Sequence, residues 1–259
     1  DNGSAATTYI HEGEGVCCTQ AIMFHLHSCG KFDQNSCKVS GGLQGLGISV
    51  VNTLSDWLKL VIWSNGKRLE MNFGRDVTVE SLKFTGDAPM GDNGKVLSGH
   101  EVTFYPSVTP FAHIDLDLDT LVHRLRELAF LNSGVVINQQ DHRGAEKFEE
   151  IVHYEGGVEA FVRHLDKYKT PILKEVIVIR GQKEGIEIDV AMQWNDNYHE
   201  QVLCFTNNIP DNGRGTHLAA FRSALTPTLN NYTEKSGVLK KEKVTLTGDD
   251  MREGLTAIV

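Results

Sequence analysis

Residues 38–52 combine glycines and nearby lysines in a pattern that could bind a phosphate. Four glycines, at positions 41, 42, 45 and 47, precede an apolar stretch. Glycine lets the backbone adopt a positive φ and approach a ligand closely, and free N–H groups at the start of a helix bind anions. Lys31 and Lys38 lie nearby, but lysines outside a known motif are more often simply solvated. From these residues alone, an anion site and a plain flexible loop are about equally compatible with the composition.

The spacing of these glycines excludes two common phosphate-binding loops. The order is not Gly-x-Gly-x-x-Gly after a strand, and no Gly-Lys-Ser/Thr follows, so neither a dinucleotide fold nor a P-loop is predicted. A segment compatible with a helix follows the glycines, from Ser49 to Leu60.

Three further segments, together with the glycine loop, resemble the gyrase B family. These are Asp1-Asn2-Gly3, Gly30-Lys31-Phe32-Asp33 and Cys204-Phe205-Thr206-Asn207-Asn208-Ile209-Pro210. The family comprises components of bacterial type II topoisomerases that belong to the GHKL ATPase superfamily, and the resemblance runs over nearly the whole chain. It implies an α+β fold: a GHKL (Bergerat-type) ATPase α/β sandwich over 1–147, followed by a ribosomal-S5-like transducer domain over 148–259.

The resemblance also implies which residues bind the nucleotide. The family carboxylate that accepts a hydrogen bond from the adenine amino group matches Asp1, and a turn glycine matches Gly3. A lysine that reaches the phosphates matches Lys31, and Lys38 is a second cation beside them. The backbone of the glycine loop would hold the phosphates, through Gly42, Leu43, Gln44, Gly45, Leu46 and Gly47.

Among the departures from the family pattern, five are carried forward here. Ser4 and Ala5 replace an arginine and a glycine, and Gln44 replaces a histidine in the loop. Ser64 stands where the family has an arginine associated with aminocoumarin binding, and His100 replaces a threonine near the adenine. These departures leave open an alternative, in which the chain is a degenerate GHKL-fold nucleotide-binding or interaction module without hydrolysis.

The resemblance places the catalytic groups outside residues 1–259. The family's catalytic glutamate and magnesium-binding asparagine would precede Asp1, and its γ-phosphate sensors would follow Val259. We therefore expect an internal fragment with no catalytic and no metal-binding residue of its own, and no ATPase activity from this chain alone. ATP and Mg²⁺ are the implied cofactors, with the magnesium ligand supplied from outside the fragment.

The implied activity is ATP-dependent negative supercoiling of DNA, driven by ATP-dependent dimer closure. The implied partners are double-stranded DNA, the gyrase A protein and a second copy of the gyrase B protein. The ATP-binding component of topoisomerase IV is a close alternative within the same class. The formal net charge of −9 argues against a chain that grips DNA along its whole surface.

The apolar runs, the cysteines and the histidines indicate the cellular compartment and argue against a zinc site. No apolar run approaches the ~20 residues needed to cross a bilayer, so no membrane partner is expected. Five cysteines, an odd number, favour a reducing cytoplasm over a disulfide framework. His25, His27, Cys29 and Cys37 lack the spacing of a zinc site.

Hydrophobic periodicity predicts the order of the elements. An Asn65-Gly66 pair predicts a hairpin between strands over 58–62 and 69–73. Pro227 is expected to kink or break a helix over 216–231. The remaining expected helices cover 11–26, 119–131 and a segment after 153–157, and the remaining strands cover 98–106, 135–137, 176–180, 186–194, 201–206 and 244–247.

Overall fold

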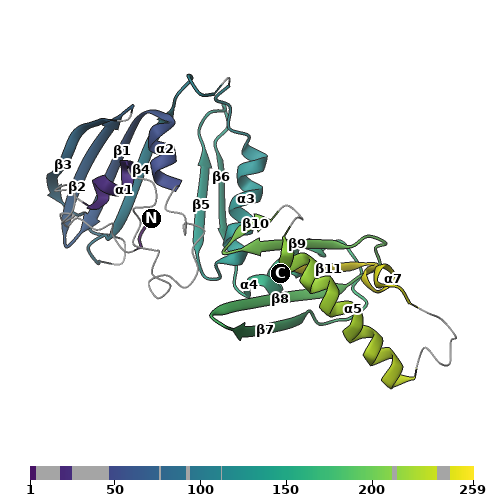
Figure 1. Ribbon diagram of the computed structural model, residues 1–259. Helices are drawn as coiled ribbons and strands as arrows, with labels where there is room; N and C mark the ends of the chain where they lie inside the picture. Colours follow the sequence, from purple (N-terminus) through teal and green to yellow (C-terminus); the bar gives the residue numbers. More distant parts are fainter. Residues whose placement is uncertain are drawn as a thin grey trace. The chain divides into compact units, whose positions relative to one another are not determined.

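The computed structural model describes residues 1–3, 18–24, 47–75, 77–91, 94–111, 113–211, 215–237 and 246–259. They form two compact units, Asp1–Asp115 and Leu116–Val259, each of which mixes helices with sheet (Figure 1). The two units are defined by which residues pack against one another, and such a division does not by itself assign a domain type. The assignment of 1–147 to an ATPase domain and of 148–259 to a transducer domain stays a prediction.

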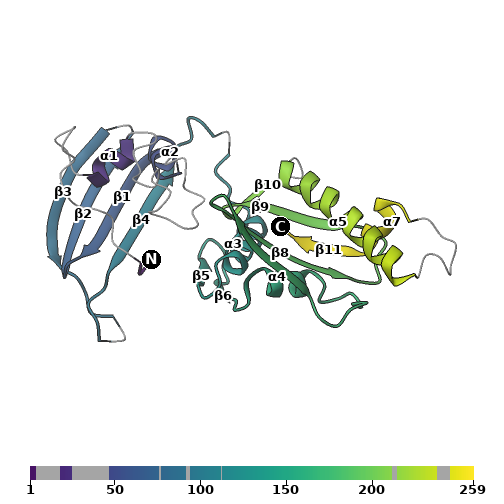
Figure 2. The ribbon, with the colours of Figure 1, turned by 60° about the horizontal axis from the view of Figure 1, so that its bottom comes forward.

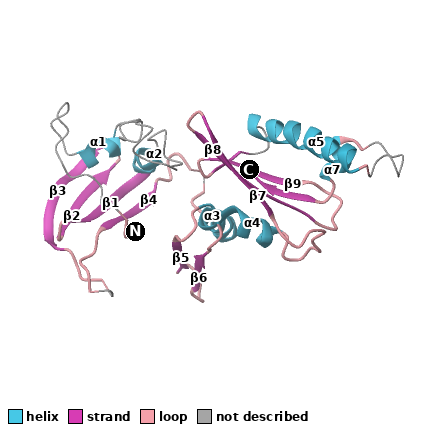
Figure 3. Ribbon diagram, turned by 90° about the horizontal axis from the view of Figure 1, so that it is seen from below, coloured by secondary structure: helices cyan, strands magenta, loops and turns pink. Residues whose placement is uncertain are grey.

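The first unit is built on a four-stranded antiparallel sheet. Its strands are β1 (Ser55–Ser64), β2 (Lys67–Gly74), β3 (Val77–Asp87) and β4 (Gly99–Pro106), in the order β3-β2-β1-β4. Two short helices, α1 (Cys18–Phe24) and α2 (Gly47–Thr53), pack on one face of this sheet (Figure 3). The predicted strands over 58–62, 69–73 and 98–106 are therefore confirmed.

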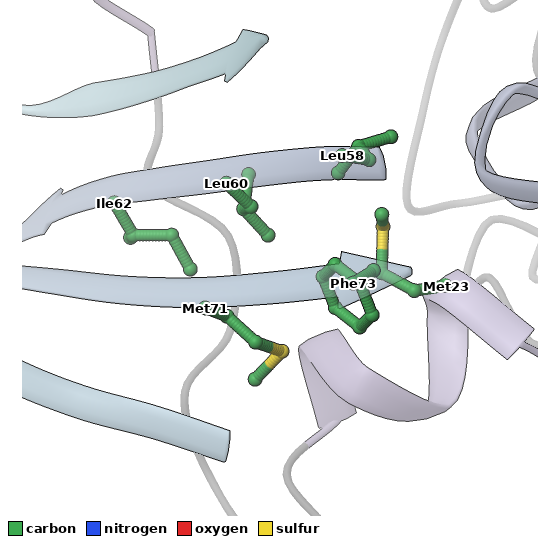
Figure 4. Close-up of a cluster of buried hydrophobic side chains, with 6 residues drawn as sticks. All are labelled: Met23, Leu58, Leu60, Ile62, Met71 and Phe73. Atoms are coloured by element: carbon green, nitrogen blue, oxygen red, sulfur yellow. The ribbon is translucent and has the colours of Figure 1, made fainter. Parts of the chain in front are cut away.

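The core of the first unit follows from the two-residue period of its strands. Leu58, Leu60 and Ile62 alternate along β1 and point to the same face, where each is at most 4% exposed. Figure 4 shows them beside Met71 and Phe73 of β2, with Met23 of α1 next to them. This apolar face is what α1 and α2 cover.

The turn between β1 and β2 is the one that the sequence predicted. Asn65 and Gly66 both have positive φ, 52° and 75°, and Ser64 pairs with Lys67 across the turn. A two-residue turn of this kind matches the twist of the flanking strands, and Asn-Gly is the pair that adopts it most readily. Helix α2, however, ends at Thr53, not at Leu60, because the alternating apolar residues that follow are committed to β1.

The second unit contains a five-stranded sheet in the order β10-β9-β11-β8-β7 (Figure 2). Strand β11 pairs in parallel with β9 and antiparallel with β8. A separate hairpin pairs β5 with β6. The strands are β5 (Val136–Asp141), β6 (Phe148–His153), β7 (Ile177–Lys183), β8 (Ile186–Trp194), β9 (Gln201–Thr206), β10 (Ile209–Asp211) and β11 (Leu255–Ile258).

Helices cover both faces of the five-stranded sheet (Figure 3). Helices α3 (Leu118–Leu131) and α4 (Gly157–Leu165) pack on the face that carries Ala191 and Ile258. Helix α5 (Thr216–Ser236) packs on the opposite face against Met192 and Ala257. Because neighbouring residues of one strand point to opposite faces, one strand contributes to both cores.

Two expectations about this unit differ from the structure. The break expected at Pro227 is absent, since α5 runs on to Ser236, and the alternative of a kink stays a prediction. Thr247 does not belong to a strand: it caps the short helix α7 (Gly248–Arg252) through a reciprocal pair of hydrogen bonds with Asp250. The expected strand residues 244–245 lie outside the described residues.

A buried polar network fastens the end of α4 to the sheet. Asp166, with a side chain 3% exposed, accepts hydrogen bonds from Lys169 Nζ at 2.9 Å and Thr256 Oγ1 at 2.7 Å. Asn195 Nδ2 donates to its other oxygen at 3.0 Å. Lys169 Nζ also reaches Gln201 Oε1 at 2.9 Å. The carboxylate is thus paired with a cation and hydrogen-bonded on both oxygens, which is what a buried charge requires.

We expect Asp166→Ala to lower the free energy of unfolding of the second unit by about 3 kcal/mol, because Lys169 loses its charge partner in a poorly solvated site. Chemical denaturation followed by circular dichroism measures this. The matched control is Asp189→Ala, which removes an exposed carboxylate 3.7 Å from Arg180 and should cost less than about 1 kcal/mol. Equal losses in the two variants would contradict the assigned role.

Candidate functional site

The first three residues lie against the start of β4 in the first unit. The amino nitrogen of Asp1 donates to the carbonyl oxygen of His100 at 2.7 Å, and Ser98 Oγ donates to the carbonyl oxygen of Gly3 at 3.3 Å. Between them, Gly99 has a φ of +133°, and a Cβ added there would overlap the backbone of Asp1. The close approach of the two segments therefore requires glycine at position 99.

The carboxylate of Asp1 is held on both oxygens. Oδ1 accepts from the backbone N–H of Gly3 at 3.1 Å, and Oδ2 lies 3.1 Å from His100 Nε2. The Asp1 side chain is 54% exposed, so solvent or a ligand can still reach it. Two residues that the sequence assigned to an adenine site, Asp1 and His100, are thus in direct contact.

The His100 imidazole is neutral near pH 7. Burial of the ring lowers its pKa from the usual 6.5. The Asp1 carboxylate, 3.1 Å from Nε2, favours the charged ring and so opposes the effect of burial. His100 Nδ1 is buried and has no hydrogen-bond partner among the residues that the structure describes. We assign the ring proton to Nε2, from which it is donated to Asp1.

Within the glycine loop, the structure describes Gly47. It is the first residue of α2 and does not have a positive φ, so its backbone conformation alone does not require glycine. A Cβ at this position would meet no atom within 4 Å among the residues that the structure describes. The other predicted binding residues lie outside the described residues: Lys31, Lys38, Gly42, Leu43, Gln44, Gly45 and Leu46.

The aminocoumarin position also lies in this unit. Ser64 is the last residue of β1, half-buried, and directly precedes the Asn65-Gly66 turn. Sequence reasoning overlooked the importance of Gly99 to the candidate site. An isolated glycine at the start of a strand often marks a close backbone approach, and that signal could have found it.

Comparison with known proteins gives the family. A family model described as DNA gyrase B matches residues 157–259. The DNA gyrase B protein of Caulobacter vibrioides is 59% identical over 263 residues, covering 100% of this chain and 33% of that protein. The corresponding protein of Rickettsia felis is 46% identical over 260 residues, covering 100% of this chain and 31% of its own length. The chain belongs to the DNA gyrase B family.

Solved structures agree with this assignment. The 43K ATPase domain of Thermus thermophilus gyrase B, in complex with an aminocoumarin, is similar with a TM-score of 0.78 and 31% identity, covering 100% of this chain and 64% of that chain. The topoisomerase IV ATP-binding domain of Francisella tularensis, at 23% identity and a TM-score of 0.71, covers 100% of this chain and 65% of its own and shares the fold. The predicted α+β GHKL fold class is confirmed.

The chain spans 33% of the length of its Caulobacter vibrioides relative. Among the described residues, none of the helices has the length and apolar character needed to cross a membrane. The family assignment therefore applies to this chain, and it does not by itself assign an activity to a longer protein.

We expect the pKa of His100 to lie below 6.5, because burial penalises the charged ring. Since the unfolded chain then binds more protons, the stability that His100 contributes falls as the pH drops below about 6.5. NMR titration of the imidazole proton measures the pKa directly. In Asp1→Asn the pKa should fall further, because the favourable carboxylate is gone; a rise in this variant would refute the described balance.

Proposed function

We propose that this chain contributes the adenine and phosphate contacts of the ATP-binding component of DNA gyrase. The observation that carries the proposal is the Asp1 carboxylate, fixed by Gly3 and His100 yet 54% exposed. A fixed and accessible carboxylate can accept a hydrogen bond from the amino group of adenine. Lys31, Lys38 and the backbone of residues 42–47 would hold the phosphates through charge and N–H donors.

In the whole protein, ATP binding would close a dimer of gyrase B proteins around double-stranded DNA, and the gyrase A protein would supply the cleavage activity. The sequence identity to gyrase B proteins, 59% for the Caulobacter vibrioides relative, supports gyrase in preference to topoisomerase IV. Hydrolysis would need a general base and a magnesium ligand, neither of which we assign to residues 1–259. Residues of the longer protein, outside this chain, would therefore hold the Mg²⁺.

One observation favours the alternative, a nucleotide-binding or interaction module without hydrolysis. His100 Nε2 already uses Oδ2 of Asp1, at 3.1 Å. Each carboxylate oxygen carries two lone pairs, so adenine can still bind, but it shares its acceptor with a neighbouring ring. Nucleotide affinity therefore decides between the two functions.

We expect Gly47→Val to weaken binding of a fluorescent ATP analogue at least about tenfold, which corresponds to roughly 1.4 kcal/mol. The branched side chain would project from the first residue of α2, where we propose that the phosphates approach the backbone. Gly181→Val is the matched control, because Gly181 also has an ordinary φ and no described atom within 4 Å of an added Cβ, but lies in β7 of the second unit. Unchanged affinity in Gly47→Val would remove the glycine loop from the nucleotide site.

A second experiment uses the drug class bound in the Thermus thermophilus structure. We expect Ser64→Arg to bind an aminocoumarin about tenfold or more tightly than the parent chain, since a charge-assisted hydrogen bond contributes roughly 1.5–3 kcal/mol. Calorimetry of both proteins measures the difference. Lys67→Arg at the other side of the same turn serves as the control, because it adds a guanidinium without changing Ser64. Equal affinities in the parent and Ser64→Arg would show that this position does not contact the drug.

A further inference from the structure

The Asp1 carboxylate has a limited number of acceptor positions for a ligand. Each of its two oxygens carries two lone pairs. Oδ1 already accepts from the backbone N–H of Gly3 at 3.1 Å, and Oδ2 lies 3.1 Å from His100 Nε2. The side chain is 54% exposed, so a ligand can reach the lone pairs that remain. Which ligand fits therefore depends on which acceptor positions stay free.

The hydrogen bond between His100 and Asp1 has a fixed direction. His100 Nδ1 is buried and has no hydrogen-bond partner among the described residues. A proton on Nδ1 would therefore be a buried donor without an acceptor among them, and the lone pair left on Nε2 would face the negative Oδ2. The tautomer with the proton on Nε2 avoids both costs, so His100 donates and Asp1 accepts.

Packing in the first unit keeps the imidazole beside the carboxylate. His100 lies directly opposite Ile62 in the pairing of β4 with β1, and opposite residues of an antiparallel pair project from the same face. Ile62 is fully buried in the core of this unit. At the neighbouring position, the backbone of Gly99 approaches that of Asp1 so closely that a Cβ would overlap it. Strand β4 thus contacts Asp1 at two successive residues.

Purine bases differ in the donors that they present to a carboxylate. Adenine offers the amino group at its C6 atom and has no N–H next to it on the ring. Guanine has a carbonyl oxygen at C6 and two neighbouring donors, the ring N–H and the 2-amino group, which can bind the two oxygens of a carboxylate side by side. Such a bidentate contact needs two free lone pairs that point the same way. A single donor needs only one free lone pair.

We propose that His100 is a specificity-determining residue of the nucleotide site, because its Nε2–H takes the lone pair of Oδ2 that a second ligand donor would need. The carboxylate then accepts one ligand donor, and the site favours the 6-amino group of adenine over the paired donors of guanine. The inference rests on the proposed function, since it takes a nucleotide as the ligand. It goes beyond that function, which needs Asp1 as an acceptor but does not need His100.

Competition against the fluorescent ATP analogue measures the preference on the chain itself, with non-hydrolysable triphosphate analogues of adenosine, guanosine and inosine. The parent should favour the adenosine analogue. His100→Leu removes the donor and keeps an apolar side chain beside Ile62, so the guanosine analogue should bind about tenfold more tightly, as expected for a regained hydrogen bond to a charged group. The adenosine analogue should stay within about threefold of the parent, since one acceptor suffices in both proteins. Inosine, which lacks the 2-amino group, should gain less than guanosine.

Two further variants separate the donated hydrogen bond from other effects. His100→Gln keeps an N–H donor near the end of the side chain, so it should retain the preference of the parent. His153→Leu is the matched control, since the His153 side chain is 41% exposed against 37% for His100 and lies 3.7 Å from the carboxylate of Glu155 in the second unit. It should behave like the parent with all three analogues. Thermal unfolding by circular dichroism verifies that the variants fold, and His100→Val, a good strand former, replaces His100→Leu if the latter does not.

The outcomes separate this inference from the proposed function. If the parent binds none of the analogues, the proposed function fails and the inference fails with it. If the parent binds the adenosine analogue without a preference over guanosine, or if His100→Leu keeps that preference, the inference is overturned and the proposed function stands. If His100→Gln loses the preference as His100→Leu does, the bulk of the ring selects the base, and the inference is overturned as well. A preference that is lost in His100→Leu but kept in His100→Gln and His153→Leu supports it.

Discussion

The second unit depends on burying both faces of one sheet at the same time. Adjacent residues of β8, Ala191 and Met192, face opposite helix layers, and Ile258 and Ala257 of β11 do the same. All four residues of β11 are buried, so this strand cannot shift by one residue without exchanging its two cores. The register of the sheet, and with it the placement of α3, α4 and α5, follows from that requirement.

Local patterns predicted the parts of the fold that local chemistry decides. Asn65-Gly66 predicted a turn because few other pairs adopt two positive φ values, and the alternation along 58–62 predicted a strand with one buried face. The break expected at Pro227 is absent, because that expectation considered only the lost N–H of a single residue. Packing along a 21-residue helix outweighs that loss.

Interactions between polar residues that lie far apart along the chain could not be predicted from the sequence. Asp166 and Arg124 both look like ordinary charged residues near a helix surface, yet one is buried against Thr256 and the other binds the backbone of Asn208. Their partners lie 90 and 84 residues away, and no periodicity encodes such a pairing. The candidate site was predictable in part: the resemblance selected Asp1 and His100, but the contact between them depends on the close approach at Gly99.

The order in which the strands of the five-stranded sheet occur along the sequence has a consequence for synthesis on the ribosome. Strand β11 lies between β8 and β9, but it follows both of them in the sequence, after α5 and α7. During translation, the edges of β8 and β9 that face each other stay unpaired until residues 255–258 emerge. At translation rates of about 5–20 residues per second, that gap lasts on the order of seconds. Unpaired strand edges are templates for association between chains, so nascent chains of this family are exposed to chaperones and to one another during that interval.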